Sequence, residues 1–387
     1  MPRCPVPRCS LAVITVAALA LAGCGSSSSS SSTSTTSAAA KSSAAATPTA
    51  FIAPFTTAST LGSTVPADGD VNPYGLVVIP SSVGKLQAGN LLVSNFNDKE
   101  NEQGTGTTID EVTPAGKSSL FASVNAKALR GPCPGGVGLT TALNVLPGGF
   151  VVVGSLPTTN GKSATAKYGC LIVLDSSGKA IETIAGPQIQ GPWDSTAISQ
   201  GSTTTLFVSN ALNGGAAKGA HTIDNSTVLR IRLQSGPGQP PAVINQQVIA
   251  NGIPWVDSPA ALVIGPTGLA LAANGTLYLA DTLANRITAI PQALTRTTPA
   301  PAGGTTVTEG GHLKEPLGLV LAPNGDIVTT NAGDGNIVET TPAGKQLSTQ
   351  LADSKMGAGS LFGLAVAPGG TGVYFVDDGE NTLRLLH

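Results

Sequence analysis

Carboxylates recur in this chain directly after short apolar runs. Asp281 follows the run 277–280, and Asp378 lies just beyond the run 373–376. Carboxylate and amide oxygens are the ligands that Ca²⁺ and Mg²⁺ take in proteins. Asp281 and Asp378 are therefore candidate ligands of a hard cation, provided that the fold brings the ends of these runs together. The alternative is that each caps its own loop by accepting backbone N–H groups.

Amide and aromatic side chains mark a possible binding surface. Asn95, Asn210 and Asn331 end other apolar runs in the same way, and they are candidate ligand-binding residues. Trp193 and Trp255 are the only tryptophans, and each precedes an apolar run. These two rings are the large aromatics best placed to line a pocket. The alternative for both is packing beneath loops.

Histidine is scarce, with three residues in the chain. His312 and Glu315 are close enough in sequence to form an acid–base pair, and they are the catalytic candidates. Both also fit ordinary solvated loop positions. The sequence has no Gly-x-Ser-x-Gly elbow, no His-Glu-x-x-His, no phosphate loop and no dinucleotide fingerprint. No motif therefore names a reaction.

The elements that must position these residues are repeated strands. An apolar strand, an Asn-Gly turn, a second strand ending on Asp and a third strand are clearest at 268–290. Such repetition is typical of a β-propeller. Each unit begins near a Gly or its equivalent, at Gly75, Gly138, Ser195, Gly268, Gly318 and Gly363. The sequence thus predicts an all-β, six-bladed β-propeller, with seven blades as the alternative because the third unit, within 191–265, is long.

Loop length distinguishes the two faces of the predicted ring. The long loops 96–107, 155–168, 211–225 and 253–265 all fall on one face, whereas the other has short turns. We expect function on this long-loop face. Cys133 and Cys170 open two strands of the second blade on that face, which predicts one disulfide. Two unpaired buried thiols are the alternative.

The last blade lacks a fourth strand, because the chain stops soon after 382–386. The segment Phe51–Thr57 precedes the first blade and has no other partner. We therefore expect an N-terminal strand near Phe51–Thr57 to close the ring, which removes the open edge between the first and last blades.

The repeat pattern resembles the NHL-repeat family of β-propellers. It carries Pro-x-Gly-Leu-Ala, then Leu-Tyr-Leu-Ala-Asp, then Asn-Arg-Ile, most completely at 266–290. Propellers include lactonases, lyases and binding proteins, so the resemblance implies fold rather than activity. Gluconolactonase-type propellers imply a cation site with an acidic residue near the start of the first blade, where this chain has Asn72. Streptogramin-lyase propellers imply an acid–base pair, for which His312 and Glu315 are the candidates.

The N-terminus predicts export and a lipid anchor. Residues 1–23 have a basic start, a short apolar stretch and small residues, as in a secretory signal. Leu21-Ala22-Gly23-Cys24 resembles the bacterial lipoprotein signal, which implies that the Cys24 thiol takes a diacylglycerol, with palmitate as its kind of acyl chain. Residues 24–50 are rich in Ser, Thr and Ala and predict a disordered tether. The propeller is then 51–387.

We therefore expect a protein held by its lipid outside the cytoplasm, on the bacterial cell membrane or outer membrane. Charged residues make up only 11% of the chain and the net charge is −2, which argues against nucleic acid as a partner. The expected function is binding of a protein, glycan or small molecule on the long-loop face. The alternative is a lactonase, other hydrolase or lyase dependent on a divalent metal such as Ca²⁺ or Mg²⁺.

Overall fold

The computed structural model describes residues 49–212, 221–236, 238–354 and 360–387. The predicted signal peptide, Cys24 and almost all of the tether lie outside these residues. No helix in the described part of the chain is long and apolar enough to cross a membrane. Three short 3-10 helices accompany the strands there, η1 (Ala126–Ala128), η2 (Ser163–Thr165) and η3 (Pro368–Gly370).

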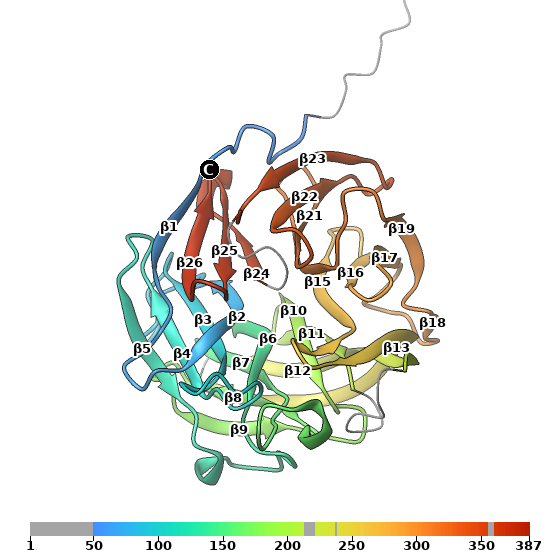
Figure 1. The fold of residues 1–387 in the computed structure, drawn as a ribbon. Coiled ribbons are helices and arrows are strands. Elements are labelled where there is room, and N and C mark those ends of the chain that lie inside the picture. The colour runs from blue at the N-terminus through green and yellow to red at the C-terminus, as the bar shows by residue number, and fades with distance from the viewer. Residues whose placement is uncertain (1–48, 213–220, 237, 355–359) are drawn as a thin grey trace, which may run out of the picture. The chain divides into compact units, whose positions relative to one another are not determined.

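Six antiparallel sheets form a ring, each sheet being one blade (Figure 1). Blade 1 has the strands β2 (Val71–Val78), β3 (Leu91–Asn97), β4 (Thr108–Val112) and β5 (Ser118–Ser123). Blade 2 has β6 (Leu139–Leu146), β7 (Phe150–Ser155), β8 (Cys170–Leu174) and β9 (Ala180–Ile184). Blade 3 has β10 (Pro192–Gln200), β11 (Thr203–Asn210), β12 (Ile223–Gly236) and β13 (Gln239–Ser258), with β14 (Leu262–Ile264) and β18 (Ala300–Pro301) added to β13.

The remaining blades are shorter. Blade 4 has β15 (Pro266–Leu271), β16 (Leu277–Asp281), β17 (Arg286–Ile290) and β19 (Thr305–Glu309). Blade 5 has β20 (Pro316–Leu321), β21 (Ile327–Asn331), β22 (Asn336–Thr340) and β23 (Gln346–Leu351). Blade 6 has β24 (Leu361–Val366), β25 (Val373–Asp377), β26 (Thr382–Leu386) and β1 (Ala58–Ser63). The predicted six-bladed propeller is confirmed, and the long third unit is one blade with lengthened outer strands.

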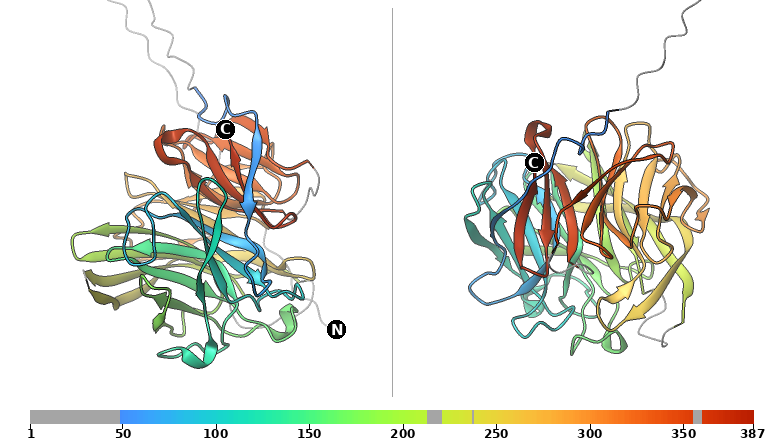
Figure 2. Two further views of the ribbon diagram at one scale, coloured as in Figure 1. Left: turned by 90° about the vertical axis from the view of Figure 1, so that its left-hand side faces the viewer. Right: turned by 45° about the horizontal axis from the view of Figure 1, so that its top comes forward.

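The core is divided between neighbouring blades. One buried cluster joins Val152 and Leu171 of blade 2 to Leu206 and Leu229 of blade 3, and similar clusters fill the other junctions. The sheets are seen edge-on in Figure 2, packed face against face around the ring. A ring of this length therefore needs no single large core, because each sheet buries its two faces against its neighbours.

An N-terminal strand closes the ring, as predicted. The strand β1 pairs antiparallel with β26, and Thr57 and His387 exchange two backbone hydrogen bonds at 3.1 and 2.9 Å. The strand begins just after the predicted segment, because residues 51–55 form a turn instead. There Ile52 is fully buried among residues of blades 5 and 6, which fixes the approach to the closing strand.

Candidate functional site

A chamber of about 800 Å³ lies at the long-loop end of the ring. Its wall comes from the starts of the innermost strands and from two of the predicted long loops, through Asn97 to Gln103 and Ser258 to Gly265. The volume lies within the range usual for small-molecule sites, roughly 300–1,000 Å³. Two of the four expected long loops, 96–107 and 253–265, thus line one opening, and part of the loop 211–225 lies outside the described residues.

Aromatic rings pack at the inner end of this chamber. The Tyr74 ring stacks on Phe362 with centroids 3.9 Å apart and on Phe96 at 4.6 Å, and the Trp193 ring meets it edge-on at 5.8 Å. Tyr74 and Trp193 are each 2% exposed, so neighbouring side chains hold their rings in place. A floor fixed in this way suits flat or apolar ligand groups, because no side-chain freedom is lost on binding.

A hairpin reaches across the chamber mouth. The strands β13 and β14 pair from Val256 to Ile264, and their turn carries Ala260. The Gln103 side chain of blade 1 donates to the Ala260 carbonyl oxygen at 2.7 Å. The blade 1 loop is supported in turn by Thr158 of blade 2, whose N–H donates to the Gly104 carbonyl at 2.9 Å. Three blades thus contribute to the rim.

The chamber holds a carboxyl group with perturbed ionisation. Asp378 lines the wall, and burial, reinforced by the charge of Asp377, raises the pKa of its carboxyl to about 8. Tyr74 is close enough that the Asp378 charge, after burial itself, raises the pKa of its phenol. Near neutral pH, Asp378 is therefore largely protonated and able to donate a hydrogen bond, and it becomes a base in mildly alkaline solution.

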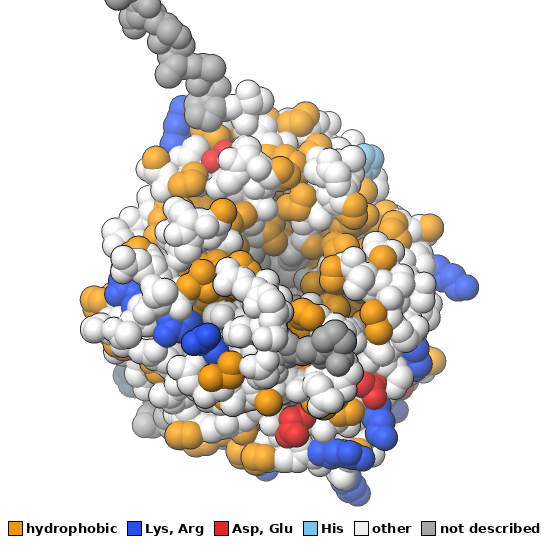
Figure 3. Space-filling view, turned by 180° about the vertical axis from the view of Figure 1, so that it is seen from behind, with side chains coloured by type: hydrophobic (Ala, Val, Ile, Leu, Met, Phe, Trp, Pro, Cys, Tyr) orange, Lys and Arg blue, Asp and Glu red, His pale blue; other side chains and the backbone are white. Residues whose placement is uncertain are grey.

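A second cavity, the tunnel, continues through the ring. Its volume is about 270 Å³, and Thr267, Leu317 and Phe362 line both it and the chamber. The tunnel wall is otherwise the later part of the innermost strands, which run toward the short-turn face. A central hollow ringed by hydrophobic side chains is visible from behind the molecule (Figure 3).

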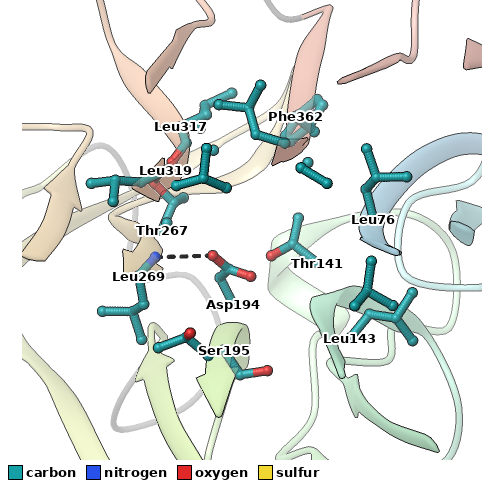
Figure 4. Close-up of a pocket in the computed structure, with 18 of the residues that line it drawn as sticks. Leu76, Thr141, Leu143, Asp194, Ser195, Thr267, Leu269, Leu317, Leu319 and Phe362 are labelled. Carbon is teal, nitrogen blue, oxygen red and sulfur yellow. Dashed lines mark hydrogen bonds between the residues drawn. The ribbon is translucent and has the colours of Figure 1, made fainter. Parts of the chain in front are cut away.

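Among the described residues of the tunnel wall, Asp194 alone is titratable. Its side chain lies between Leu269 and Thr141, and its carboxylate accepts the Leu269 backbone N–H at 3.1 Å (Figure 4). Burial raises the pKa of this carboxyl to about 7. Sequence reasoning missed Asp194 because it placed the repeat glycine's equivalent at Ser195.

The strand register shows what Asp194 replaces. In blade 4, Gly268 lies in the bulge between the pairs Pro266–Asp281 and Leu269–Leu279. In blade 3, Asp194 has the same place between the pairs Pro192–Asn210 and Ser195–Val208. The signal in the sequence was thus Pro192-Trp193-Asp194 in place of Pro-x-Gly.

Solved structures share this architecture. A luciferin-regenerating enzyme aligns with a TM-score of 0.53 at 11% identity, over 86% of this chain and 95% of that one. A gluconolactonase from Xanthomonas campestris gives 0.51 at 13%, over 85% and 88%. A streptogramin B lyase gives 0.50 at 14%, over 86% and 98%. The fold is that of the six-bladed β-propellers.

At these identities the likeness concerns the fold alone. No protein-family model matches the sequence, and no curated protein matches it. The resemblance to NHL repeats and to bacterial lipoproteins therefore remains a prediction from sequence. Propeller lactonases and lyases are among the solved proteins that share this fold.

The two tryptophans have different environments. Trp193 lines the chamber, as the ligand-binding hypothesis requires. Trp255 is 1% exposed and lines neither cavity, and its indole N–H donates to the Asn225 side-chain oxygen at 2.7 Å. Trp255 thus follows the alternative interpretation, packing beneath a loop.

The three asparagines serve their own loops. Asn210 accepts the N–H groups of Gln190 and Gly191 at 2.9 and 2.8 Å. Asn95 donates to Thr64, Thr108 and Asp110, and Asn331 donates to the His312 carbonyl and to Asp334. All three are fully buried, and none lines either cavity. The loop-capping role accounts for them.

The metal candidates separate in space. Asp281 is fully buried, forms an ion pair with Arg286 at 2.8 Å and lines neither cavity, whereas Asp378 lines the chamber. Across the described segments, no group of three His, Cys, Asp or Glu side chains is arranged to hold a metal ion. The described residues therefore do not fit a three-ligand Ca²⁺ or Mg²⁺ centre, and we derive no step through a metal.

His312 and Glu315 also occupy different positions. Glu315 is exposed and lines the chamber, whereas His312 is exposed and lines neither cavity. The His312 N–H donates to the Gln346 side chain at 2.7 Å, and the Glu315 N–H donates to Asn285 at 2.9 Å. No hydrogen bond joins their side chains among the interactions described, so Glu315 alone stays a candidate within the chamber.

A disulfide lies beside the long-loop face. Cys133 and Cys170 are joined, with Cα atoms 5.1 Å apart and a sequence separation of 37. The bond ties the irregular segment before β6 to the start of β8. It therefore fixes, together with the hydrogen bond from the Thr183 hydroxyl of β9 to the Pro132 carbonyl at 2.9 Å, the loop that precedes β6.

Proposed function

We propose that this protein binds a small, mostly uncharged organic molecule in the chamber on its long-loop face. The observation that carries the proposal is an open-mouthed chamber of about 800 Å³ above a packed aromatic floor. A pocket of this kind buries a compact ligand better than it buries a flat protein surface. Protein and glycan partners are therefore the less favoured occupants.

The chamber wall defines the ligand's chemistry. Its polar groups are mainly amides and hydroxyls, such as Asn72, Asn101 and Ser258, with Lys99, Glu315 and Asp378 as its charged or titratable members. Because the wall carries both a positive and a negative side chain, and because Asp378 is largely protonated at neutral pH, a strongly charged ligand gains little electrostatic stabilisation there. A ring with a few hydroxyl or carbonyl oxygens fits best.

Intrinsic fluorescence tests this function, because the chain has two tryptophans. The protein is titrated with δ-valerolactone, a sugar δ-lactone and phenyl acetate. A saturable change is expected for at least one probe. It should persist in Trp255→Phe and disappear in Trp193→Phe, whose ring still fills the floor. A response that survives Trp193→Phe, or no response to any probe, would count against the chamber as the site.

A second candidate is lactone hydrolysis or lyase chemistry in the same chamber. Two observations favour it: propeller enzymes of these kinds are structural neighbours, and the carboxyl of Asp378 has a pKa near 8 beside Tyr74. Once ionised, Asp378 could take a proton from an attacking water or from a substrate carbon.

Turnover separates the two candidates. If Asp378 is the base, lactone hydrolysis rises with pH through about 8, the pKa of its carboxyl, and the rise vanishes in Asp378→Asn. The matched control is Asp281→Asn, a buried carboxylate outside the chamber. Ligand binding without turnover would leave a binding function as the remaining candidate. Hydrolysis that is unchanged in Asp378→Asn would eliminate Asp378 as the base.

We also propose that the protein is attached outside the cytoplasm by a lipid on Cys24. The support is the sequence 21–24, together with the Cys133–Cys170 disulfide, which is typical of exported proteins. Mass spectrometry of the N-terminal peptide should find a diacylglycerol on Cys24, and Cys24→Ser should release the protein from membranes. An unmodified thiol on the mature protein would refute the lipid anchor.

A further inference from the structure

Four of the six blades have glycine where the innermost strand meets the next blade. These are Gly75, Gly268, Gly318 and Gly363. A Cβ at Gly318 would collide with the Phe362 carbonyl of blade 6, and one at Gly268 would collide with the Leu317 carbonyl of blade 5. The backbones therefore approach so closely at these junctions that no side chain fits.

Blade 3 meets blade 4 differently. Asp194 stands at the glycine's register position, and its carboxylate, rather than a bare backbone, contacts the next innermost strand at the Leu269 N–H. A carboxyl group is thereby placed inside the tunnel. Glycine makes the corresponding junction in blades 1, 4, 5 and 6, so closing the ring does not by itself require a carboxyl group.

The tunnel offers this carboxyl no protein counter-ion. No Lys, Arg or His is present among the residues described in its wall. Its other polar side chains serve the protein: Asn144 donates to Ser195, and the Thr267 hydroxyl is bonded to Thr282 and the Leu317 carbonyl. Most of the remaining wall is aliphatic, including Leu76, Leu143 and Leu319 (Figure 4).

The Asp194 side chain is half-buried, and a carboxylate that is partly withdrawn from water is stabilised by a positive charge or by a proton. A wall of mainly aliphatic side chains with one carboxylate complements a molecule that has one ammonium group and an apolar body. We propose that the tunnel is a second ligand site, distinct from the chamber, which takes a compact alkyl- or arylammonium ion with its nitrogen on Asp194.

The ammonium group replaces the proton that Asp194 otherwise carries. Because the pKa of the free carboxyl is about 7, roughly half of the molecules should release a proton on binding at pH 7. Affinity should rise with pH through this value, since the ionised carboxylate is the binding form.

The test uses 2-phenylethylammonium and its uncharged analogue 2-phenylethanol, measured by calorimetry with the full chain. We expect saturable binding of the amine, with heats in two buffers showing proton release near pH 7, and weaker binding of the alcohol. Asp194→Asn keeps an oxygen for the Leu269 N–H but has no charge. It should weaken amine binding by about ten- to a hundred-fold, as for loss of a charged hydrogen bond. Glu100→Gln, an exposed carboxylate, should leave binding unchanged.

Equal binding of amine and alcohol, or full amine binding by Asp194→Asn, would show an ordinary apolar cavity and overturn the proposal. No binding of the amine to the unaltered protein would do the same. If Asp194→Asn does not fold, Ala365→Leu provides the second test, because it narrows the tunnel and leaves Asp194 in place. Amine binding that survives this narrowing contradicts the assignment.

Discussion

The carboxylate of Asp194 accepts the Leu269 backbone N–H at 3.1 Å and so joins the innermost strands of blades 3 and 4. The bond gives the ring one junction that contains a titratable group. Stability and ligand binding are consequently linked to pH at this junction.

Stability should fall as the pH rises from about 5 to about 8. The folded-state pKa values of Asp194 and Asp378 are raised to about 7 and about 8, from 3.8. Between these values the folded chain retains protons that the unfolded chain has lost, so raising the pH favours unfolding, by at most about 1.4 kcal/mol per pH unit for each group. Urea unfolding across this range measures the slope. Asp194→Asn should flatten it and Glu100→Gln should not; a slope unaffected by Asp194→Asn would contradict the assignment.

The N-terminal segment should detach when Glu339 is changed. Its carboxylate accepts the backbone N–H groups of Phe51 and Ile52, both at 2.7 Å. Glu339→Gln brings an NH₂ group against one of these donors, which should cost about 1–3 kcal/mol. Limited proteolysis is expected to cut near residue 52 faster.

Blade 1 provides the control for Glu339. Glu111 lies before the same Thr-Pro-Ala-Gly-Lys turn and accepts from Gln87 and Asn90 of its own blade. Glu111→Gln should lower the melting temperature without exposing residue 52. Equal cleavage in both variants would mean that the Glu339 bonds do not hold the segment.

Reduction of the Cys133–Cys170 disulfide should destabilise the protein by about 2–4 kcal/mol, as is usual for a bond that closes a loop of this kind. The double variant Cys133→Ala, Cys170→Ala should reproduce the lower melting temperature and no longer respond to dithiothreitol. A melting temperature indifferent to reductant in the unaltered protein would rule out a stabilising bond.

Replacing Asp281 and replacing Asp378 should lower the free energy of unfolding by different amounts. Asp281 is fully buried and paired with the half-buried Arg286, so Asp281→Ala should leave that guanidinium without its ion-pair partner and cost about 3 kcal/mol. Asp378 is partly exposed and has no ion pair among those described, so Asp378→Ala should cost far less. Chemical denaturation of both variants measures the difference, and the reverse order would contradict it.

The fold could be predicted from the sequence because it depends on local, repeated signals. The identical turns at 113–117 and 341–345 have the same hydrogen bonds, with Gly116 and Gly344 donating to Thr113 and Thr341, both at 2.8 Å. Closure of the ring by an N-terminal strand could be predicted because the strand expected at 382–386 had no outer strand to pair with. Its start at Ala58 could not be predicted, since it depends on the turn that buries Ile52.

The site was less predictable because it depends on which way single side chains face. Asn95, Asn210 and Asn331 end equivalent strands, and nothing local shows that their amides turn into the loops. A one-residue difference in bulge register separates Ser195 from Asp194, and only the strand pairing shows which one meets the next blade.

The pairing of β1 with β26 also has a mechanical consequence. Any pull on the chain before residue 51 passes first through the Glu339 contacts and then into hydrogen bonds that join the first strand of the fold to its last. Under load the ring would therefore open at this seam, between Ala58–Ser63 and Thr382–Leu386, while the blades carrying Trp193 and Asp194 remain intact. Because blades 1 and 6 both contribute to the walls of the chamber and the tunnel, tension on the N-terminus would reach the two cavities through this seam.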